Sequence, residues 1–278
     1  MEKNANRGKI LIKTIIVALC SILFVVPLIW MLLSSLKTTP EVFARPYHWL
    51  PKAFQWHNYA DVWTNKQMPL LTAFGNSLYI VFFSIIGQLT IASFAAYAFA
   101  RINFKGKGFI FLLFLSSMMI PSQVTIIPRF MLFKTIGLYN SLWAIILPNF
   151  FGATAIFLLR QFYIGLPDDL MEAARIDGAG HLRIFAQIMM PLTKAALVSL
   201  FILSFISSWN EYLSPLIFLT KPARFTVSQA IRWYMQDEDK QHNLTMAAAA
   251  SAIIPVIVLF VFCQKYFVEG IATSGVKG

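Results

Sequence analysis

Six uninterrupted apolar stretches constrain the fold of this chain more than any other feature of its sequence. Each stretch is long enough to cross a lipid hydrocarbon core, which takes about 20 apolar residues. Their ranges are 15–33, 77–100, 108–128, 135–159, 195–220 and 243–264. Backbone polar groups in lipid must be satisfied within the segment, so each stretch is predicted to be a helix. The sequence therefore predicts an all-α, multi-pass membrane protein of six transmembrane helices, with residues 1–278 forming a single domain.

Composition and charge agree with a membrane protein and exclude other classes. Only 13% of the residues are charged, whereas a soluble domain carries about 25%. A net charge of +11 can indicate nucleic-acid binding, but the cations flank apolar stretches, as membrane topology requires. Nucleic acid is therefore not an expected partner, whereas membrane lipid is. Cys20 and Cys263 lie inside apolar stretches and are interpreted as small apolar residues.

The distribution of cations predicts the orientation. Four cations precede the first stretch, and three lie within residues 101–107, which favours a cytoplasmic location for both segments. Six spans then place the C-terminus in the cytoplasm as well, together with the loop over residues 165–191. Trp49, Trp56 and Trp63 recur every seven residues in an outer segment, and this spacing predicts a helix lying on the outer membrane interface.

Motifs for catalysis are missing from the sequence. There is no G-x-x-x-x-G-K-[ST] phosphate-binding loop, the four histidines have no metal-ligand spacing, and no serine or cysteine lies in a nucleophile motif. The chain is therefore not expected to be an enzyme, and we expect it to bind no metal and no cofactor itself.

The loop between the fourth and fifth stretches contains a short predicted helix over residues 168–178. Asp168 or Asp169 can cap its N-terminus, and Asp169 with Glu172 resembles a capping box. Gly178 suits the left-handed position after the last turn. So short a helix is marginal in water, which means that it needs a surface to pack against.

The central residues of this predicted helix could contact a partner. Ala173 and Ala174 permit close approach, and Glu172, Arg175 and Asp177 offer charges. These physical features alone leave two interpretations open: a helix that docks on another protein, and a loop helix solvated at the membrane interface.

A motif in this loop favours the helix that docks on another protein over the solvated loop helix. "EAARIDGAGHLRIFAQIMMP", residues 172–191, resembles the pattern E-A-A-x(3)-G-x(9)-I-x-L-P of ABC importer permeases. Met190 replaces the leucine, which conserves volume. The matching residues are Glu172, Ala173, Ala174, Gly178, Ile188 and Pro191. Further segments, "NSLYIV", "SWNEYLSPLIFL" and "YFVEGIATSGVKG" among them, are similar to the permeases of carbohydrate importers of the maltose-transporter type.

This resemblance implies a fold, partners and a mechanism. The fold would be that of a type I ABC importer permease in the cytoplasmic membrane of a bacterium. The partners would be a second homologous permease, two ATP-binding subunits that carry ATP and Mg, and an extracytoplasmic solute-binding protein. The substrate would be a sugar, an oligosaccharide or a related glycerol compound, moved by alternating access. The residues implied to couple the chain to the ATPase are Glu172, Ala173, Ala174, Arg175, Asp177, Gly178 and Ala179.

Glu211 is the one ionisable residue inside the predicted spans, and such residues usually face a cavity or a partner. Together with Trp209, Asn210 and Tyr212 it would suit a sugar site on the translocation pathway. The alternative is a structural polar cluster at the interface between permease subunits. Two weaker pathway candidates are Gln123 and Asn149, either of which could instead hydrogen-bond a neighbouring helix.

Two other functions remain open from the sequence. An ABC permease for a non-sugar solute such as a polyamine would have a similar loop. A self-sufficient secondary transporter would need intramembrane charges or an inverted repeat, and the sequence offers one such charge and no visible repeat.

Overall fold

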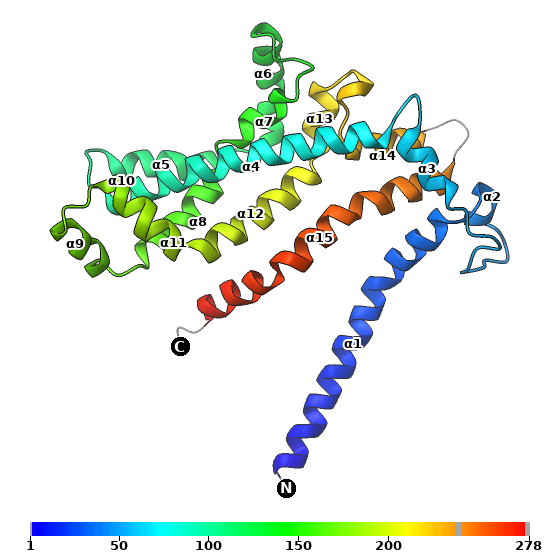
Figure 1. Ribbon diagram of the computed structural model, residues 1–278, viewed down its shortest axis with the longest axis horizontal. Coiled ribbons are helices and arrows are strands. Elements are labelled where there is room, and N and C mark those ends of the chain that lie inside the picture. Colours follow the sequence, from blue (N-terminus) through cyan, green and yellow to red (C-terminus); the bar gives the residue numbers. More distant parts are fainter. Residues whose placement is uncertain (1, 237–240, 276–278) are drawn as a thin grey trace. The chain divides into compact units, whose positions relative to one another are not determined.

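The computed structural model describes the backbone of residues 2–236 and 241–275 and the side chains of residues 10–236 and 241–264 (Figure 1). Helices dominate these described residues, which include no β-strand, so the all-α prediction is confirmed. The helices are α1 (Glu2–Ser35), α2 (Thr39–Val42), α3 (His57–Thr64), α4 (Leu70–Arg101), α5 (Lys107–Ser117), α6 (Ser122–Thr135), α7 (Trp143–Asn149), α8 (Ala153–Ile164), α9 (Asp169–Ile176), α10 (His181–Ile184), the π-helix η1 (Phe185–Met189), α11 (Met190–Leu192), α12 (Lys194–Trp209), α13 (Leu213–Phe218), the 3-10 helix η2 (Pro222–Arg224), α14 (Val227–Gln236) and α15 (His242–Gly275).

Four helical segments among the described residues are long and apolar enough to cross a membrane. They are Ile10–Ser35, Leu70–Arg101, Trp143–Ile164 and His242–Gln264. Two further candidates are bent pairs: Lys107–Ser117 with Ser122–Thr135, which meet at 95°, and His181–Leu192 with Lys194–Trp209, which meet at 75°. The number of candidate spans is six if each bent pair counts as one.

Three of the predicted spans are not the continuous helices that their hydropathy suggests. The stretch 108–128 breaks after Ser117 and resumes at Ser122, because the residue before Pro121 is disfavoured in helical geometry. The first part of 135–159 is not helical, since Gly137 and Asn140 have the left-handed φ values of 77° and 56°. The stretch 195–220 breaks after Trp209.

The outer aromatic segment also differs from its prediction. Only the end of it, α3, is helical, and Trp49 and Trp56 lie outside that helix. Both of these side chains are exposed, whereas Trp63 is partly buried and its indole nitrogen donates to Ser251 Oγ at 3.2 Å. The predicted helix through all three tryptophans is therefore wrong, because Pro51 interrupts the segment between Trp49 and Trp56.

The chain divides into two compact units, residues 1–71 with 230–254 and residues 72–229 with 255–278. A polar network holds the first unit together. The buried Asn58 Nδ2 donates to the carbonyls of Ser35 and Lys37, at 2.8 and 2.9 Å, and Asn58 Oδ1 accepts from Asn243 Nδ2 at 3.0 Å. Tyr234 Oη donates to the carbonyl of Met68 at 2.9 Å. These bonds satisfy the chain ends that flank α1 and α3.

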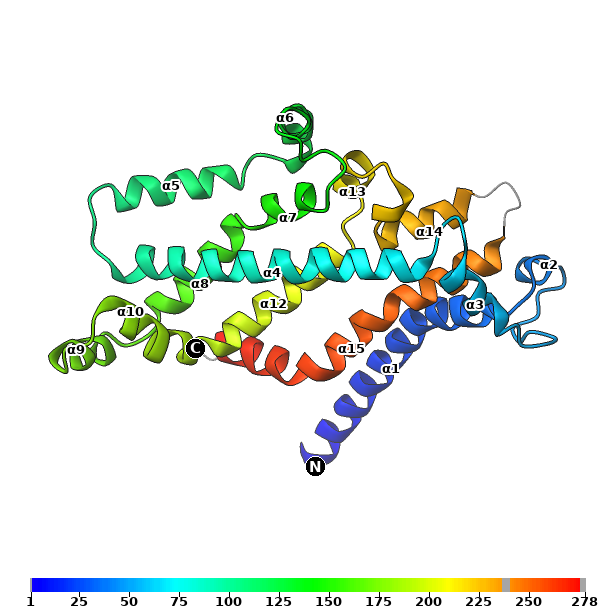
Figure 2. The same cartoon turned by 45° about the horizontal axis from the view of Figure 1, so that its top comes forward.

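Close packing between helices holds the second unit together. Near the middle of α4, a Cβ on Gly87 would lie 2.2 Å from Phe150 Cε1, so any other residue there would force the Phe150 ring to move. One apolar cluster lies around Tyr97, Tyr163 and Phe185, and another lies around Ile146 and Phe218. Figures 1 and 2 show α9 in this unit, beyond the end of α4.

Candidate functional site

The predicted loop helix is present as α9, which spans Asp169–Ile176. Its N-terminus is built differently from the prediction. Asp168 is the N-cap residue, but its side chain makes no capping hydrogen bond, and the predicted capping box of Asp169 with Glu172 is not formed. The carboxylate of Asp168 instead pairs with Arg101 at the end of α4. The first-turn N–H groups of Met171 and Glu172 bond to the Asp168 carbonyl, at 2.9 and 3.1 Å.

The C-terminus of α9 agrees with the prediction. Gly178 has a φ of 77°, in the left-handed region. The N–H of Ala179 donates to the Ala174 carbonyl at 2.9 Å, and the N–H of Gly178 donates to the Arg175 carbonyl at 3.0 Å. This pair of bonds is a Schellman motif, which satisfies carbonyls that the end of a helix leaves free.

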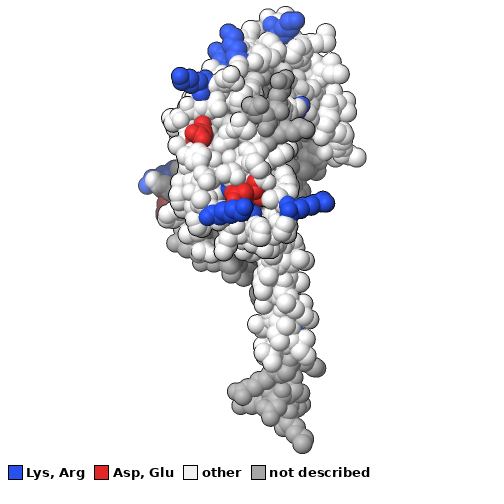
Figure 3. Space-filling view, turned by 90° about the vertical axis from the view of Figure 1, so that its right-hand side faces the viewer, with Lys and Arg blue, Asp and Glu red and all other residues white. Residues whose placement is uncertain are grey.

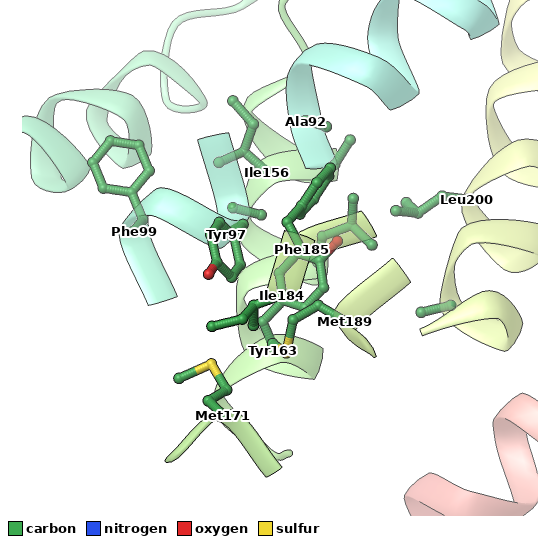
Figure 4. Packing of buried hydrophobic residues seen from close by; sticks show 14 of the residues in the cluster. Ala92, Tyr97, Phe99, Ile156, Tyr163, Met171, Ile184, Phe185, Met189 and Leu200 are labelled. Atoms are coloured by element: carbon green, nitrogen blue, oxygen red, sulfur yellow. The ribbon is translucent and has the colours of Figure 1, made fainter. Parts of the chain in front are cut away.

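One face of α9 packs on the core of its own unit. Met171 and Ala174 are buried in the cluster that includes Tyr97, Tyr163 and Phe185 (Figure 4). Burying a methionine side chain contributes about 1.5–3 kcal/mol, so α9 already has the surface that so short a helix needs. Ala174 is buried against this core whereas Ala173 is exposed, because neighbouring residues on a helix point in different directions.

The opposite face of α9 is exposed and carries mixed chemistry. Glu172, Ala173, Arg175 and Asp177 are all exposed. Within the described residues, neither Glu172 nor Arg175 forms an ion pair. Ile176 is 86% exposed, which is unusual for so large an apolar side chain. This face therefore offers one apolar and several charged groups to whatever covers it.

Arg101 fastens the loop to α4. Its side chain is only 7% exposed. The guanidinium donates to the carbonyls of Tyr163 and Leu166, at the end of α8, and to the carboxylate of Asp168. A cation at a helix C-terminus also interacts favourably with the helix dipole. The sequence reasoning used Arg101 only as a topological cation and missed this role.

The rest of the motif follows directly. The chain turns at Gly180, runs through α10, and continues as the π-helix η1, which includes Ile188 of the motif. Single π-turns are often found at functional sites. A hollow of about 190 Å³ adjoins α9 and is lined by Ala174, Asp177 and Arg183 among others.

The second group of predicted residues surrounds the break between α12 and α13. Trp209 is buried, with its ring stacked on Phe205 at a centroid distance of 5.8 Å. Asn210 Nδ2 donates to the Ile206 carbonyl of its own helix at 2.9 Å. Tyr212 is partly buried and begins the turn into α13.

The sequence had suggested that Glu211 lies inside a helix. The structure places it instead in this break. Its Oε1 accepts the backbone N–H of Ser214 at 2.8 Å and so satisfies a donor in the first turn of α13. Arg129 Nη2 donates to Ser214 Oγ at 3.2 Å. Arg129 belongs to α6, which extends past the predicted span end at 128. Glu211 is thus not the only ionisable residue in this part of the molecule.

The two weaker candidates differ from one another. Asn149 Nδ2 donates to Ser84 Oγ of α4 at 3.3 Å, which confirms that it bonds to a neighbouring helix. Gln123 is exposed in the first turn of α6, and its Oε1 accepts a hydrogen bond from the adjacent Ser122 Oγ at 3.5 Å. The structure does not bring Gln123 together with the other candidates.

Asn149 lines a cavity of about 260 Å³ in the second unit, and this lining combines leucines with polar residues. We call it the polar cavity after these polar residues. Gln88 of α4 and three serines of α12 are also in its lining, and no charged residue is. The serines are Ser204, Ser207 and Ser208. The sequence reasoning missed them, although their spacing of three and four residues places them on one helix face. Neutral donors and acceptors of this kind suit a solute that carries hydroxyl groups and no cationic centre.

Comparison with known proteins defines the class. Residues 88–273 match the family described as the binding-protein-dependent transport system inner membrane component. The chain also shares its fold, at a TM-score of 0.83 and 22% identity, with a chain from a bacterial ABC transporter involved in the import of the acidic polysaccharide alginate; the match covers 95% of this chain and 98% of the other.

Several relatives are similar over nearly their whole length. The arabinooligosaccharides transport system permease protein AraQ of Halalkalibacterium halodurans is 34% identical over 267 residues, which is 95% of each chain. The sn-glycerol-3-phosphate transport system permease protein UgpE of Yersinia pestis is 33% identical over 266 residues, 94% of each chain. The chain therefore belongs to the family of binding-protein-dependent transport system inner membrane components. It is a non-catalytic, multi-pass permease subunit of the bacterial inner membrane, and this membership decides against a self-sufficient secondary transporter.

Proposed function

We propose that this chain is one of two permease subunits of an ABC importer for a carbohydrate rich in hydroxyl groups. The observation that carries the substrate class is the cavity lined by Gln88, Asn149 and the serines of α12. Its amide and hydroxyl groups match sugar hydroxyls, which both donate and accept hydrogen bonds. The names of the relatives, which concern arabinooligosaccharides and sn-glycerol 3-phosphate, support the same class.

Coupling to ATP hydrolysis would occur through the exposed face of α9. Glu172, Ala173, Arg175 and Asp177 would contact the ATP-binding subunit, and this subunit would hold ATP and Mg. Ala174 would instead anchor the helix to the permease, because it is buried in the permease's own core. Gly178 and Ala179 would shape the exit from the helix through their Schellman bonds.

The role proposed for the break between α12 and α13 follows from its bonds. Glu211 would organise the start of α13 through its bond to Ser214. Asn210 and Tyr212 would border the translocation pathway, and Trp209 would support them from the core. Of the residues predicted for the pathway, Asn149 has the strongest support, because it lines the polar cavity.

The remaining partners are supported by exposed apolar surface. An apolar groove of about 750 Å³ runs between α4 and α12, with Phe82 and Phe205 in its lining, and a second homologous permease would cover it. We further propose that the N- and C-termini are cytoplasmic, with residues 276–278 outside the described residues, and that a solute-binding protein delivers substrate from the other side.

A non-sugar importer, for a polyamine for example, is the second candidate. A polyamine carries several positive charges and needs carboxylates for its recognition. The cavity at Asn149 has no carboxylate in its lining, so this candidate is disfavoured.

Uptake by the complete transporter in liposomes tests the proposal. The complex with its solute-binding protein would be offered an arabino-oligosaccharide, sn-glycerol 3-phosphate and spermidine in turn. We expect ATP-dependent uptake of a hydroxylated solute and none of spermidine. Uptake of spermidine alone would overturn the carbohydrate proposal but leave the permease assignment intact.

A further inference from the structure

The segment that follows α1 forms a basic hollow within the first unit. Its volume is about 190 Å³, and its lining includes Lys37, Arg45, His48 and Lys52 together with Glu41. Lys37 comes two residues after α1 ends at Ser35. The proposed function in sugar transport assigns no role to these residues. The hollow therefore needs a separate explanation.

Lys37 is the buried cation of this hollow. The residue is only 1% exposed. Its ammonium donates to the His48 carbonyl at 2.5 Å and to Tyr47 Oη at 3.3 Å, and it lies 4.3 Å from the centre of the Tyr47 ring. An ammonium group has three N–H donors, and two of them have these acceptors. Burial of a charge without an opposite charge is costly.

The charges that face the hollow are unbalanced. Lys37, Arg45 and Lys52 stand against the single carboxylate of Glu41, and within the described residues none of these three cations forms an ion pair. The Glu41 carboxylate already accepts the backbone N–H of Thr38 at 3.2 Å. This hydrogen bond lowers the pKa of Glu41, so the residue is charged at neutral pH and does not act as a donor. The charge of Lys52 also lowers the pKa of Glu41, so this carboxylate balances part of the positive charge. The hollow as a whole still holds more cations than carboxylates.

The location of the hollow identifies the anion. The apolar segment of α1 is 26 residues long, or about 39 Å at 1.5 Å per residue, which exceeds a hydrocarbon core of about 30 Å. Residues just past Ser35 therefore lie at the depth of lipid headgroups. Aromatic side chains are enriched at the depth of the headgroups. Several exposed aromatic residues are neighbours in sequence of the residues that line the hollow. They are Tyr47, Trp49, Phe54 and Trp56. Figure 3 shows this side of the molecule, on which basic and acidic side chains lie close together.

We propose that this hollow binds the phosphate of an anionic phospholipid headgroup. The ammonium of Lys37 forms the floor, and the exposed side chains of Arg45 and Lys52 close over the phosphate. The exposed aromatic rings contact the glycerol and upper acyl region of the same lipid. A free phosphate ion shares the headgroup's chemistry, but it would make no use of the aromatic rings. The site is independent of the substrate that the transporter carries.

Lipid titration of the purified transporter complex tests this site. Phosphatidylglycerol and phosphatidylcholine would be added separately to the delipidated complex in detergent, and bound lipid would be counted by native mass spectrometry. Phosphatidylglycerol should bind more tightly than phosphatidylcholine. Each exposed cation near an anionic headgroup is worth about fivefold in affinity, so Arg45→Gln with Lys52→Gln should weaken phosphatidylglycerol binding roughly 25-fold. The single variants are measured as well, in case the double variant does not assemble.

Lys66→Gln is the matched control. Lys66 is also exposed and lies in the segment just before α4, but it does not line the hollow. It should leave lipid binding unchanged. An equal loss in Lys66→Gln would reduce the effect to general surface charge and overturn the site. Displacement of phosphatidylglycerol by millimolar inorganic phosphate would show a free-anion site instead, and unchanged binding in the single variants would also overturn the proposal.

Discussion

Arg101 connects parts of the second unit that are 62 to 67 residues apart in sequence. Its guanidinium satisfies two carbonyls at the end of α8 and neutralises Asp168 at the start of α9. Because the side chain is nearly buried, no water can easily replace it. The contact therefore ties the end of α4 to the end of α8 and the start of α9, so we expect motion of α4 to reach this loop.

Arg101→Ala should destabilise this connection. Asp168 is 72% exposed, so its ion pair with Arg101 contributes little. The hydrogen bonds from Arg101 to two carbonyls contribute about 1.5–3 kcal/mol each, so the melting temperature of the complex should fall. Substrate-stimulated ATP hydrolysis should fall more than basal hydrolysis, because the loop would no longer follow α4. Lys105→Ala is the control, since Lys105 is an exposed cation in the link that follows α4. Equal melting temperatures for the two variants would contradict the role of Arg101.

Gly178→Val should uncouple transport through backbone strain alone. A Cβ at Gly178 would meet nothing within 4 Å, but the left-handed φ of 77° disfavours any side chain, by roughly 1–2 kcal/mol and more for a β-branched residue. Gly137→Val is the matched control, because Gly137 has the same φ and equally open surroundings outside the coupling loop. Stimulated ATP hydrolysis should fall in the first variant only. A similar fall in both would mean that general instability is the cause.

At the scale of single elements, α9 has one buried and one exposed face. Met171 and Ala174 bind it to the permease core, whereas Glu172, Arg175 and Ile176 remain exposed. A helix with this arrangement can transmit movement, because one face is anchored while the other is free to dock.

Glu172→Lys should weaken binding of the ATP-binding subunit. A charge-assisted hydrogen bond contributes about 1.5–3 kcal/mol, so its loss should reduce association at least tenfold, and the reversed charge adds repulsion. Glu172→Gln should have an intermediate effect. The measurement is a pull-down of the ATP-binding subunit beside stimulated ATP hydrolysis. If both variants bound the ATP-binding subunit fully and kept full stimulation of ATP hydrolysis, α9 would have no coupling role and would be an ordinary helix at the membrane interface.

The polar cavity is the second element-scale feature. Asn149→Leu should raise the KM of uptake, because the loss of one hydrogen bond of about 0.5–1.5 kcal/mol corresponds to a change of roughly 2- to 13-fold. Ser199→Ala is the control, since the Ser199 hydroxyl bonds to the Ala195 carbonyl of its own helix at 2.9 Å and does not line the cavity. An unchanged KM in Asn149→Leu would remove Asn149 from the pathway.

At the scale of the whole molecule, the chain is one component of a larger machine. Its family is the inner membrane component of a transport system that depends on a binding protein. The segment Ile10–Ser35 shows how incomplete the isolated chain is, because none of its most apolar window is buried. Lipid or another subunit must cover that surface.

The purified chain alone should neither hydrolyse ATP nor move solute into liposomes. It has no phosphate-binding loop, so it cannot supply the energy for transport. The complete complex in identical liposomes serves as the positive control. Solute accumulation by the isolated chain would contradict the dependence on partner subunits.

Sequence alone determined the class of the protein, three of the six predicted spans as continuous helices, and the motif in the loop. These features depend on local physics: lipid selects long apolar helices, and Gly178 selects the left-handed end of α9. Hydropathy could not find the breaks near Pro121 and at Glu211, because a break between apolar segments leaves the average hydropathy unchanged.

Only the tertiary structure decided which side chains meet. It buried Ala174 while leaving Ala173 exposed, directed Asp168 to Arg101 instead of to its own helix, and gathered Asn149 with the serines of α12 around one cavity. It also joined Lys37 to His48 and Tyr47 in the basic hollow. The physical reason is the same in each case: a hydrogen bond or packing contact between distant residues depends on how helices approach, and no local pattern in the sequence encodes that approach.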